Sequence, residues 1–270
     1  MMRHPLLRLA GAVASLLAIS PVPARAQQPE PLSDNSFLIE EAYNQDPGVV
    51  QHIRAFSLGS GGAWAYSFTQ EWPYRGRAQQ LSYTVQFIHG DGSGFGDLLL
   101  NYRYQLAGNS AAILAVAPRL SAVIPIGSVD RDRGAGSLGV QAALPVSYHV
   151  IPALALHANA GLTWLPHAEN PAGNRAGTVS YSVGASAIWL ARPRLNLLVE
   201  WLWQDNERVA TGGGTQRQQA MFLNPGIRFG WDSPGGLQIV PGVAYTIGVG
   251  PSRGEDAVFL YLSFEHAFGH

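Results

Sequence analysis

Residues 153–164 read ALALHANAGLTW, in which apolar side chains alternate with small or polar ones. Leu154, Leu156 and Leu162 share one parity, whereas His157 and Asn159 have the other. Because successive side chains of a β-strand point to opposite faces, such a strand has one apolar and one polar face. The apolar face lies inward in a soluble β-sandwich, but it faces lipid in a transmembrane β-barrel, whose lumen is then polar. The rest of the chain has to distinguish these architectures.

The N-terminus predicts export. Arg3 and Arg8 flank an apolar run from Leu6 to Ile19, and Ala24-Arg25-Ala26 follows as a small-x-small cleavage site. This pattern is typical of a secretory signal peptide that is removed after Ala26. The run has about 14 residues, fewer than the roughly 20 that a spanning helix needs, so no transmembrane helix is expected in the mature chain.

The composition narrows the function classes. The chain has no cysteine, so disulfides cannot stabilise the exported protein and hydrogen-bonded strands must do so. Its formal net charge is -1, which gives no electrostatic basis for a nucleic-acid partner. All of its basic residues are arginines, whose planar guanidinium can hold a carboxylate bidentately inside a crowded lumen.

The alternation recurs along the chain and predicts an antiparallel transmembrane β-barrel of about twelve strands. The expected strands are 49–57, 63–73, 80–88, 96–106, 111–125, 137–150, 153–165, 178–190, 195–204, 220–231, 236–248 and 257–268. The chain then divides into a signal peptide (1–26), an N-terminal segment (27–48) and an outer-membrane barrel (49–270). Pro118, Pro225 and Pro241 argue against three of these strands, because proline removes a donor from the ladder.

The connections between the expected strands are an independent check. Short ones, such as 151–152 and 191–194, alternate with longer, glycine-rich and charged ones, such as 166–177 and 205–219. Short periplasmic turns alternate with long extracellular loops in outer-membrane barrels. A soluble sandwich has no reason to sort its loops in this way, so the pattern favours the barrel. The brief connection at 59–62 is an exception.

Four stretches carry a more specific signal. They are SFLIEEAYNQ (36–45) with PGVVQH (47–52), GFGD (94–97), PRL leading to IPIG (118–127), and NPGIR (224–228). Together they resemble the outer-membrane β-barrel family of the MetA pathway of phenol degradation, whose members are described as transporters. The resemblance implies an outer-membrane barrel that transports small, aromatic or hydrophobic compounds. It implies no established substrate and no set of functional residues.

Charges of both signs have the inward parity of the expected strands. The candidates for a lumen constriction are Glu71, Asp97, Arg103, Arg119, Glu200, Arg228 and Glu265. A barrel of about twelve strands is narrow, so opposed carboxylates and guanidiniums either filter solutes or form a structural network that fills the lumen. Their spacing specifies no acid/base pair, and no catalytic residue is expected.

Residues 36–45 precede the first strand and carry Glu40 and Glu41. Two interpretations stay open for them. The segment folds back into the lumen as a plug, where the two carboxylates meet inward arginines, or it remains a periplasmic tail with solvated acids.

The sequence favours a passive outer-membrane channel for uptake or export of small solutes in a Gram-negative cell. The expected partners are outer-membrane lipid, the solute and, during biogenesis, the barrel-assembly machinery. No metal or cofactor is expected, since the glycine-rich loop at 90–97 carries too few acids for a calcium site. One alternative is a non-conducting structural or ligand-binding barrel. A membrane-embedded lipid hydrolase is another, although no Gly-x-Ser-x-Gly elbow occurs.

Overall fold

The computed structural model describes residue 32, residues 34–90 and residues 92–268 of the chain. The signal peptide expected at 1–26 lies outside the described residues, as do residues 27–31 of the N-terminal segment. No helix in the described part of the chain is long and apolar enough to cross a membrane.

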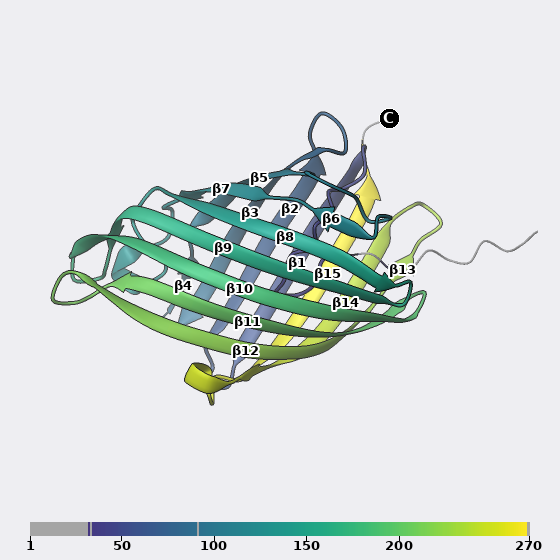
Figure 1. The fold of residues 1–270 in the computed structure, drawn as a ribbon. Helices are drawn as coiled ribbons and strands as arrows, with labels where there is room; N and C mark the ends of the chain where they lie inside the picture. Colours follow the sequence, from purple (N-terminus) through teal and green to yellow (C-terminus); the bar gives the residue numbers. More distant parts are fainter. Residues whose placement is uncertain (1–31, 33, 91, 269–270) are drawn as a thin grey trace, which may run out of the picture.

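The described strands form one antiparallel sheet that closes on itself (Figure 1). β1 pairs with both β2 and β15, and β12 pairs with β14. The strands are β1 (Val49–Gly59), β2 (Trp64–Pro73), β3 (Gln79–Gly90), β4 (Gly92–Phe95), β5 (Leu98–Tyr104), β6 (Leu114–Val116), β7 (Arg119–Ile124), β8 (Gly139–Ile151), β9 (Leu154–Glu169), β10 (Arg175–Arg192), β11 (Leu195–Val209), β12 (Thr215–Phe229), β13 (Trp231–Asp232), β14 (Gln238–Gly248) and β15 (Ala257–Ala267). Short 3-10 helices lie at Val129–Arg131 and Gly250–Ser252.

These segments build a twelve-stranded barrel, so the predicted fold is confirmed. β6 and β7 form one wall strand, because both pair with β8. β4 continues β5 against β3, and β13 is a short ribbon against β14. Val49 and Ala267 are paired, so the start of the first strand and the end of the last strand lie at one end of the barrel. We call this the terminal end, and the opposite one the loop end.

The three prolines sit where the ladder needs fewer donors. Pro118 lies between β6 and β7, which breaks the strand predicted at 111–125. Pro225 pairs with Val199 of β11, while the ladder from β12 to β14 is interrupted between Leu223 and Gly226. Pro241 pairs with Leu262 of β15, while the ladder from β14 to β12 stops at Gly242. Each proline therefore lacks a donor on a side where no ladder bond is required.

The loops expected at 166–177 and 205–219 are shorter than predicted. β9 and β10 extend to a tight turn at 170–174, and β11 and β12 extend to one at 210–214. These extensions carry polar side chains on both faces, such as Asn206, Glu207, Gln218 and Gln219. Alternation cannot reveal strands there, because a β-ladder that leaves the membrane needs no apolar face.

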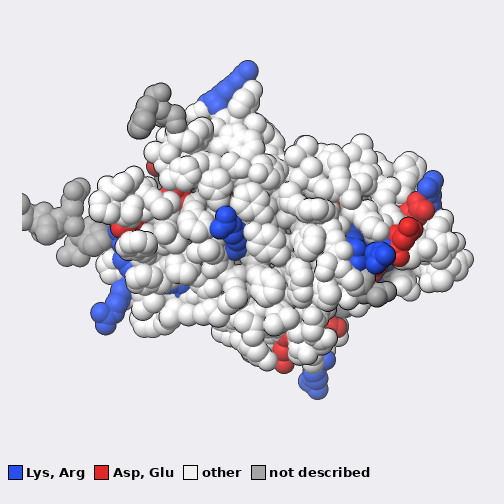
Figure 2. Space-filling view, turned by 180° about the vertical axis from the view of Figure 1, so that it is seen from behind, with Lys and Arg blue, Asp and Glu red and all other residues white. Residues whose placement is uncertain are grey.

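The outer wall is apolar and the interior is polar or small. In the stretch that opens the sequence analysis, Leu156, Leu162 and Trp164 are exposed on the outside, whereas His157 is buried inside. Figure 2 shows a largely uncharged wall, with most charges gathered toward the two ends. The main apolar core lies inside the barrel and consists of Leu32, Phe37, Ile188, Leu198, Val240, Ala244, Phe259 and Tyr261.

Candidate functional site: the lumen and its N-terminal segment

Residues 34–48, which we call the lumenal segment, enter the barrel from the terminal end. Residues 34–45 are buried or half-buried inside it, and residues 46–48 are exposed at the rim. The segment forms no helix or strand, and its one turn lies directly before β1. Its backbone groups therefore need hydrogen-bond partners from the wall. Side chains supply them. Glu200 of β11 accepts hydrogen bonds from the backbone N–H groups of Leu38 (2.8 Å) and Ile39 (3.1 Å). Asn159 of β9 accepts from the N–H of Glu40 (2.7 Å) and donates to its carbonyl (2.9 Å).

The same pattern continues toward the first strand. The N–H of Ala42 donates to Ser147 Oγ of β8 (2.8 Å), and that of Asn44 donates to Gln105 Oε1 (3.0 Å). The N–H of Gln45 donates to Gln80 Oε1 of β3 (2.7 Å). Polar wall residues therefore replace the ladder that the segment lacks and fix its path along the lumen.

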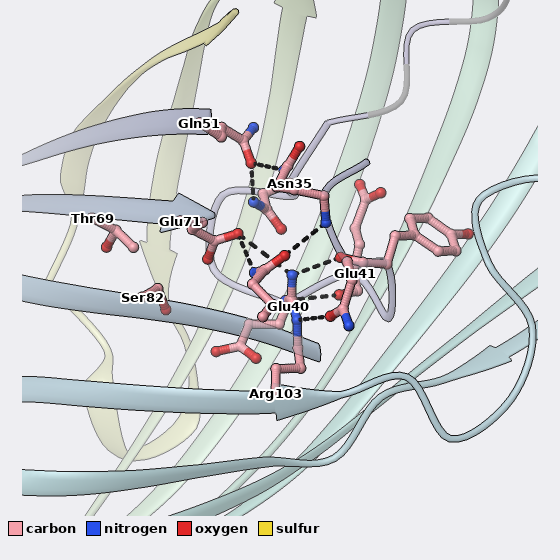
Figure 3. Close-up of polar contacts among 12 residues, drawn as sticks. Asn35, Glu40, Glu41, Gln51, Thr69, Glu71, Ser82 and Arg103 are labelled. Carbon is pink, nitrogen blue, oxygen red and sulfur yellow. Dashed lines mark hydrogen bonds and ion pairs between the residues drawn. The ribbon is translucent and has the colours of Figure 1, made fainter. Parts of the chain in front are cut away.

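Arg103 of β5 donates hydrogen bonds to a carbonyl oxygen and a side-chain amide oxygen of the segment. It is 3% exposed, donates to Tyr43 O (2.6 Å) and Asn44 Oδ1 (2.9 Å), and lies 3.4 Å from Glu71 Oε2 of β2. Figure 3 shows Glu71, Arg103 and Gln51 around Asn35, Glu40 and Glu41 of the segment. Charge-assisted bonds of this kind are stronger than neutral ones, so Arg103 holds residues 43–44 in place.

Arg119 of β7 and Glu40 form a bidentate ion pair. Their N–O distances are 2.7 Å from Nη2 to Oε1 and 3.1 Å from Nε to Oε2. Nη1 of Arg119 also donates to Asn101 Oδ1 (3.0 Å). Glu40 keeps part of its carboxylate open to the lumen, with a third of its side chain exposed (33%).

Arg228 of β12 is the central cation of the second ion pair. Its guanidinium donates to the carbonyls of Asp34 and Asn35 and lies 3.3 Å from Glu41 Oε1. Burial raises the pKa of the Glu41 carboxyl, although Arg228 opposes this shift. Burial likewise raises the pKa of Asp34 to about 6, against the attraction of Arg228. Burial is thus the dominant cause for both carboxyls, and the neighbouring Glu41 carboxylate raises the pKa of Asp34 further.

Apolar contacts hold the segment on the opposite side. The ring of Phe37 stacks on Phe259 (5.6 Å between centroids) and Tyr261 (5.0 Å) of β15. A Cβ at Gly242 of β14 would lie 2.5 Å from this ring, so glycine is needed there for the close approach. Gly184 of β10 makes room for Ile39 in the same way.

The structure separates the sequence candidates into two groups. Glu71, Arg103, Arg119, Glu200 and Arg228 surround the lumenal segment together with its own Glu40 and Glu41. Asp97 lies apart at the loop end, where it accepts from the N–H groups of Gly127 (3.0 Å) and Ala135 (2.9 Å). Glu265 lines a cavity at the terminal end with Asp34, Asp46 and Asp232. Their function stays a prediction.

Sequence reasoning missed the uncharged partners of the segment. The sequence pattern did not identify Asn159, Ser147, Gln80 and Gln105 as partners of the segment. It did not identify Asp34 either, which lies just before the stretch at 36–45. Their inward parity was the available signal, because polar residues that face a lumen inside a strand have no other partner in the ladder.

Cavities lie on both sides of the lumenal segment. Toward the loop end, Leu38, Leu202, Phe222 and Phe259 line a largely apolar cavity of about 550 Å³. Toward the terminal end, a second one of about 660 Å³ is bordered by Leu32, Tyr43, Ile188 and the turn at 149–152. The segment thus stands between two spaces large enough for small molecules.

Two solved structures that share this fold are a channel and a porin. The COG4313 outer membrane channel from Pseudomonas putida F1 matches 88% of this chain and 100% of its own, with a TM-score of 0.61 and 15% identity. The NanC porin matches 82% of this chain and 100% of its own, with a TM-score of 0.54 and 9% identity. None of the curated proteins matches the sequence. The family model described as "Putative MetA-pathway of phenol degradation" matches residues 48–254, and the chain belongs to this family.

Proposed function

We propose that this protein is a passive channel of the Gram-negative outer membrane for small solutes, and that the lumenal segment is its plug. The observation that carries the proposal is the placement of cavities of about 550 and 660 Å³ on the two sides of the segment. A solute that crosses the barrel has to pass this segment. The terminal end of the barrel then faces the periplasm, where both chain ends of such barrels lie.

The lining supports solutes with an apolar part. The cavity toward the loop end exposes mainly apolar atoms of Leu38, Leu202 and Phe222, while hydrogen-bonding groups line the opposite wall of the lumen. We infer that small aromatic or hydrophobic compounds with one polar group suit this lumen best. Movement would be diffusive, with the solute as the sole ligand and no catalytic step.

Single-channel conductance in planar bilayers tests the proposal. We expect the folded mature chain to show low or gated conductance, and the chain without residues 27–48 to show a larger, steady one. Arg175→Gln serves as the control, because its exposed guanidinium pairs with Glu169 at the loop end and borders neither of the two cavities.

A silent barrel in both forms would contradict the channel. It would favour the alternative of a closed structural or ligand-binding barrel, for which the dense hydrogen bonding of the lumenal segment is the supporting observation. A solute-release assay in liposomes that compares aromatic with aliphatic solutes of equal size tests the substrate class separately.

A further inference from the structure

One arginine lies on the outer wall of the barrel, away from the lumen. Arg54 is the sixth of the eleven residues of β1 and is exposed, on the same parity as His52, Phe56 and Leu58. Figure 2 shows basic charge on the wall that stands apart from the charges at the two ends. An arginine on the lipid face costs about 2–4 kcal/mol at the midplane and less toward the interface, so its retention there needs an explanation.

The guanidinium of Arg54 points toward the terminal end. Across the ladder, Arg54 pairs with Phe68 of β2 and Leu262 of β15, while Phe264 pairs with His52, one row nearer that end. Cζ of Arg54 lies 5.0 Å from the ring centroid of Phe264 and 6.0 Å from that of Phe68. Cation–π contacts with these two rings therefore hold the guanidinium closer to the terminal end than the backbone of Arg54.

Two histidines continue from this cation toward the interface. His52 stacks on His266 of β15, with 5.4 Å between ring centroids. His266 pairs with Val50, the residue before Gln51. Gln51 pairs with Glu71, the residue before Trp72. Tryptophans on the outer face of such barrels mark the membrane interface. Arg54, His52 and His266 thus form a polar path from within the apolar band to its boundary.

This outer wall provides no acidic partner. The two carboxylates on β15, β1, β2 and β3 are Glu71, which contacts Arg103 inside the barrel, and Glu265, which lines the cavity at the terminal end. No hydrogen bond or ion pair within the described residues involves the Arg54 guanidinium. A second copy that faced this wall would place another arginine against it, so its partner has to be an anion supplied by the membrane.

We propose that Arg54 and His52 bind the phosphate of a glycerophospholipid in the leaflet at the terminal end, with His266 as the residue that orients His52. The guanidinium presents its fork to the phosphate oxygens, and the His52 imidazole adds a donor nearer the interface. His266 donates through Nδ1 to the carbonyl of Ala267 (2.9 Å) and stacks on the His52 ring. Phe68 and Phe264 contact the acyl chains. The site is independent of the lumen, so it stands whether or not the barrel conducts.

Native mass spectrometry of the folded full chain tests this site. Delipidated protein is titrated with phosphatidylglycerol or with diacylglycerol of the same acyl chains. We expect phosphatidylglycerol to remain bound and diacylglycerol to dissociate. Arg54→Gln should weaken phosphatidylglycerol binding about tenfold or more, and Arg54→Lys less, because lysine keeps the charge but not the fork. Arg253→Gln, which changes an exposed arginine at the loop end, is the matched control.

Three results would overturn the proposal. They are equal retention of phosphatidylglycerol by the wild type and Arg54→Gln, equal binding of diacylglycerol, and a dimer that Arg54→Gln abolishes, which would assign the wall to self-association. Heat-modifiable mobility on gels reports whether each variant is folded. If Arg54→Gln does not fold, the double variant with His52→Ala and His266→Ala is used, with an expected loss of phosphatidylglycerol binding that is smaller but still measurable.

Discussion

The wall from β2 to β9 and the wall from β10 to β15 with β1 contact the lumenal segment in different ways. The first half supplies hydrogen bonds and ion pairs through Arg103, Arg119, Ser147 and Asn159. The wall residues of the buried apolar core all come from the second half, namely Ile188, Leu198, Val240, Ala244, Phe259 and Tyr261. Directional bonds fix which backbone group lies where, whereas apolar burial supplies attraction without direction.

Arg228 and Glu200 are exceptions, because they place polar anchors within the apolar half. Glu200 accepts hydrogen bonds from the N–H groups of Leu38 and Ile39. Arg228 is 2% exposed and faces Glu41 and the carbonyls of Asp34 and Asn35. The comparison therefore predicts that removing this cation has the largest effect. A buried carboxylate without its partner is far more costly than a lost apolar contact of the same size.

Arg228→Met should release the lumenal segment, with a loss of about 3–5 kcal/mol from leaving Glu41 buried and unpaired. Hydrogen exchange of the backbone amides of Leu38, Ile39 and Glu40 measures the release, since each donates to a wall side chain. The double variant with Glu41→Gln should recover part of the protection. Unchanged exchange in Arg228→Met would show that the apolar half holds the segment by itself.

Phe37→Ala tests the apolar half and should cost about 3 kcal/mol, because the ring is buried against Phe259 and Tyr261. Gly242→Ala should have a similar effect, since its Cβ would contact the same ring. The two changes should be less than additive, because the smaller side chain at position 37 makes room for the new methyl group.

The same exchange assay measures this pair. Leu260→Ala is the matched control, since Leu260 lies between Phe259 and Tyr261 on β15 but is exposed on the outer wall. Fully additive losses from Phe37→Ala and Gly242→Ala would show that the methyl group at position 242 destabilises the protein through contacts other than that with the Phe37 ring.

The packing of Asp34 should weaken as pH rises. Its pKa is raised from 3.8 to about 6, chiefly by burial, so the native state prefers the protonated carboxyl. The stabilisation is then fully present below pH 3.8 and is lost as pH rises through about 6, with a magnitude of up to about 3 kcal/mol. Glu41, Arg228 and Tyr261 are the ionisable groups that act most strongly on this carboxyl. The ionisable groups that line the same cavity are Tyr43, Asp46, Arg194, Asp232 and Glu265.

Conductance or exchange measured between pH 4 and 7 checks this dependence. The segment should open more readily at the higher pH, and Asp34→Asn should remove most of the change. Glu41, whose pKa is also raised, contributes in the same direction, so the double variant with Glu41→Gln separates the two carboxyls. Greater opening at the lower pH would contradict the assignment.

The sequence predicted the fold far better than the site. Alternation places the wall strands and also the inward arginines, because parity alone decides which face a strand residue occupies. Parity cannot tell which inward charge meets which, since that depends on the path of residues 34–48 across the lumen. This segment has no hydrophobic period. The wall residues that bind its backbone, such as Asn159 and Ser147, lie 119 and 105 residues away from their partners in the sequence. Asp97 and Glu265 share the inward parity yet lie near opposite ends of the barrel.

The Arg119–Glu40 pair should contribute the least of the anchors described above. Its geometry is bidentate, at 2.7 and 3.1 Å, but a third of the Glu40 side chain is exposed, so water screens the attraction. We expect Arg119→Gln to cost about 1 kcal/mol or less in segment protection, because the Asn159 side chain still binds both backbone groups of Glu40. The effect should shrink further in high salt, whereas that of Arg228→Met should not. If Arg119→Gln instead exposes the whole segment, the polar half supplies attraction as well as register, and the division of roles between the two halves of the wall is wrong.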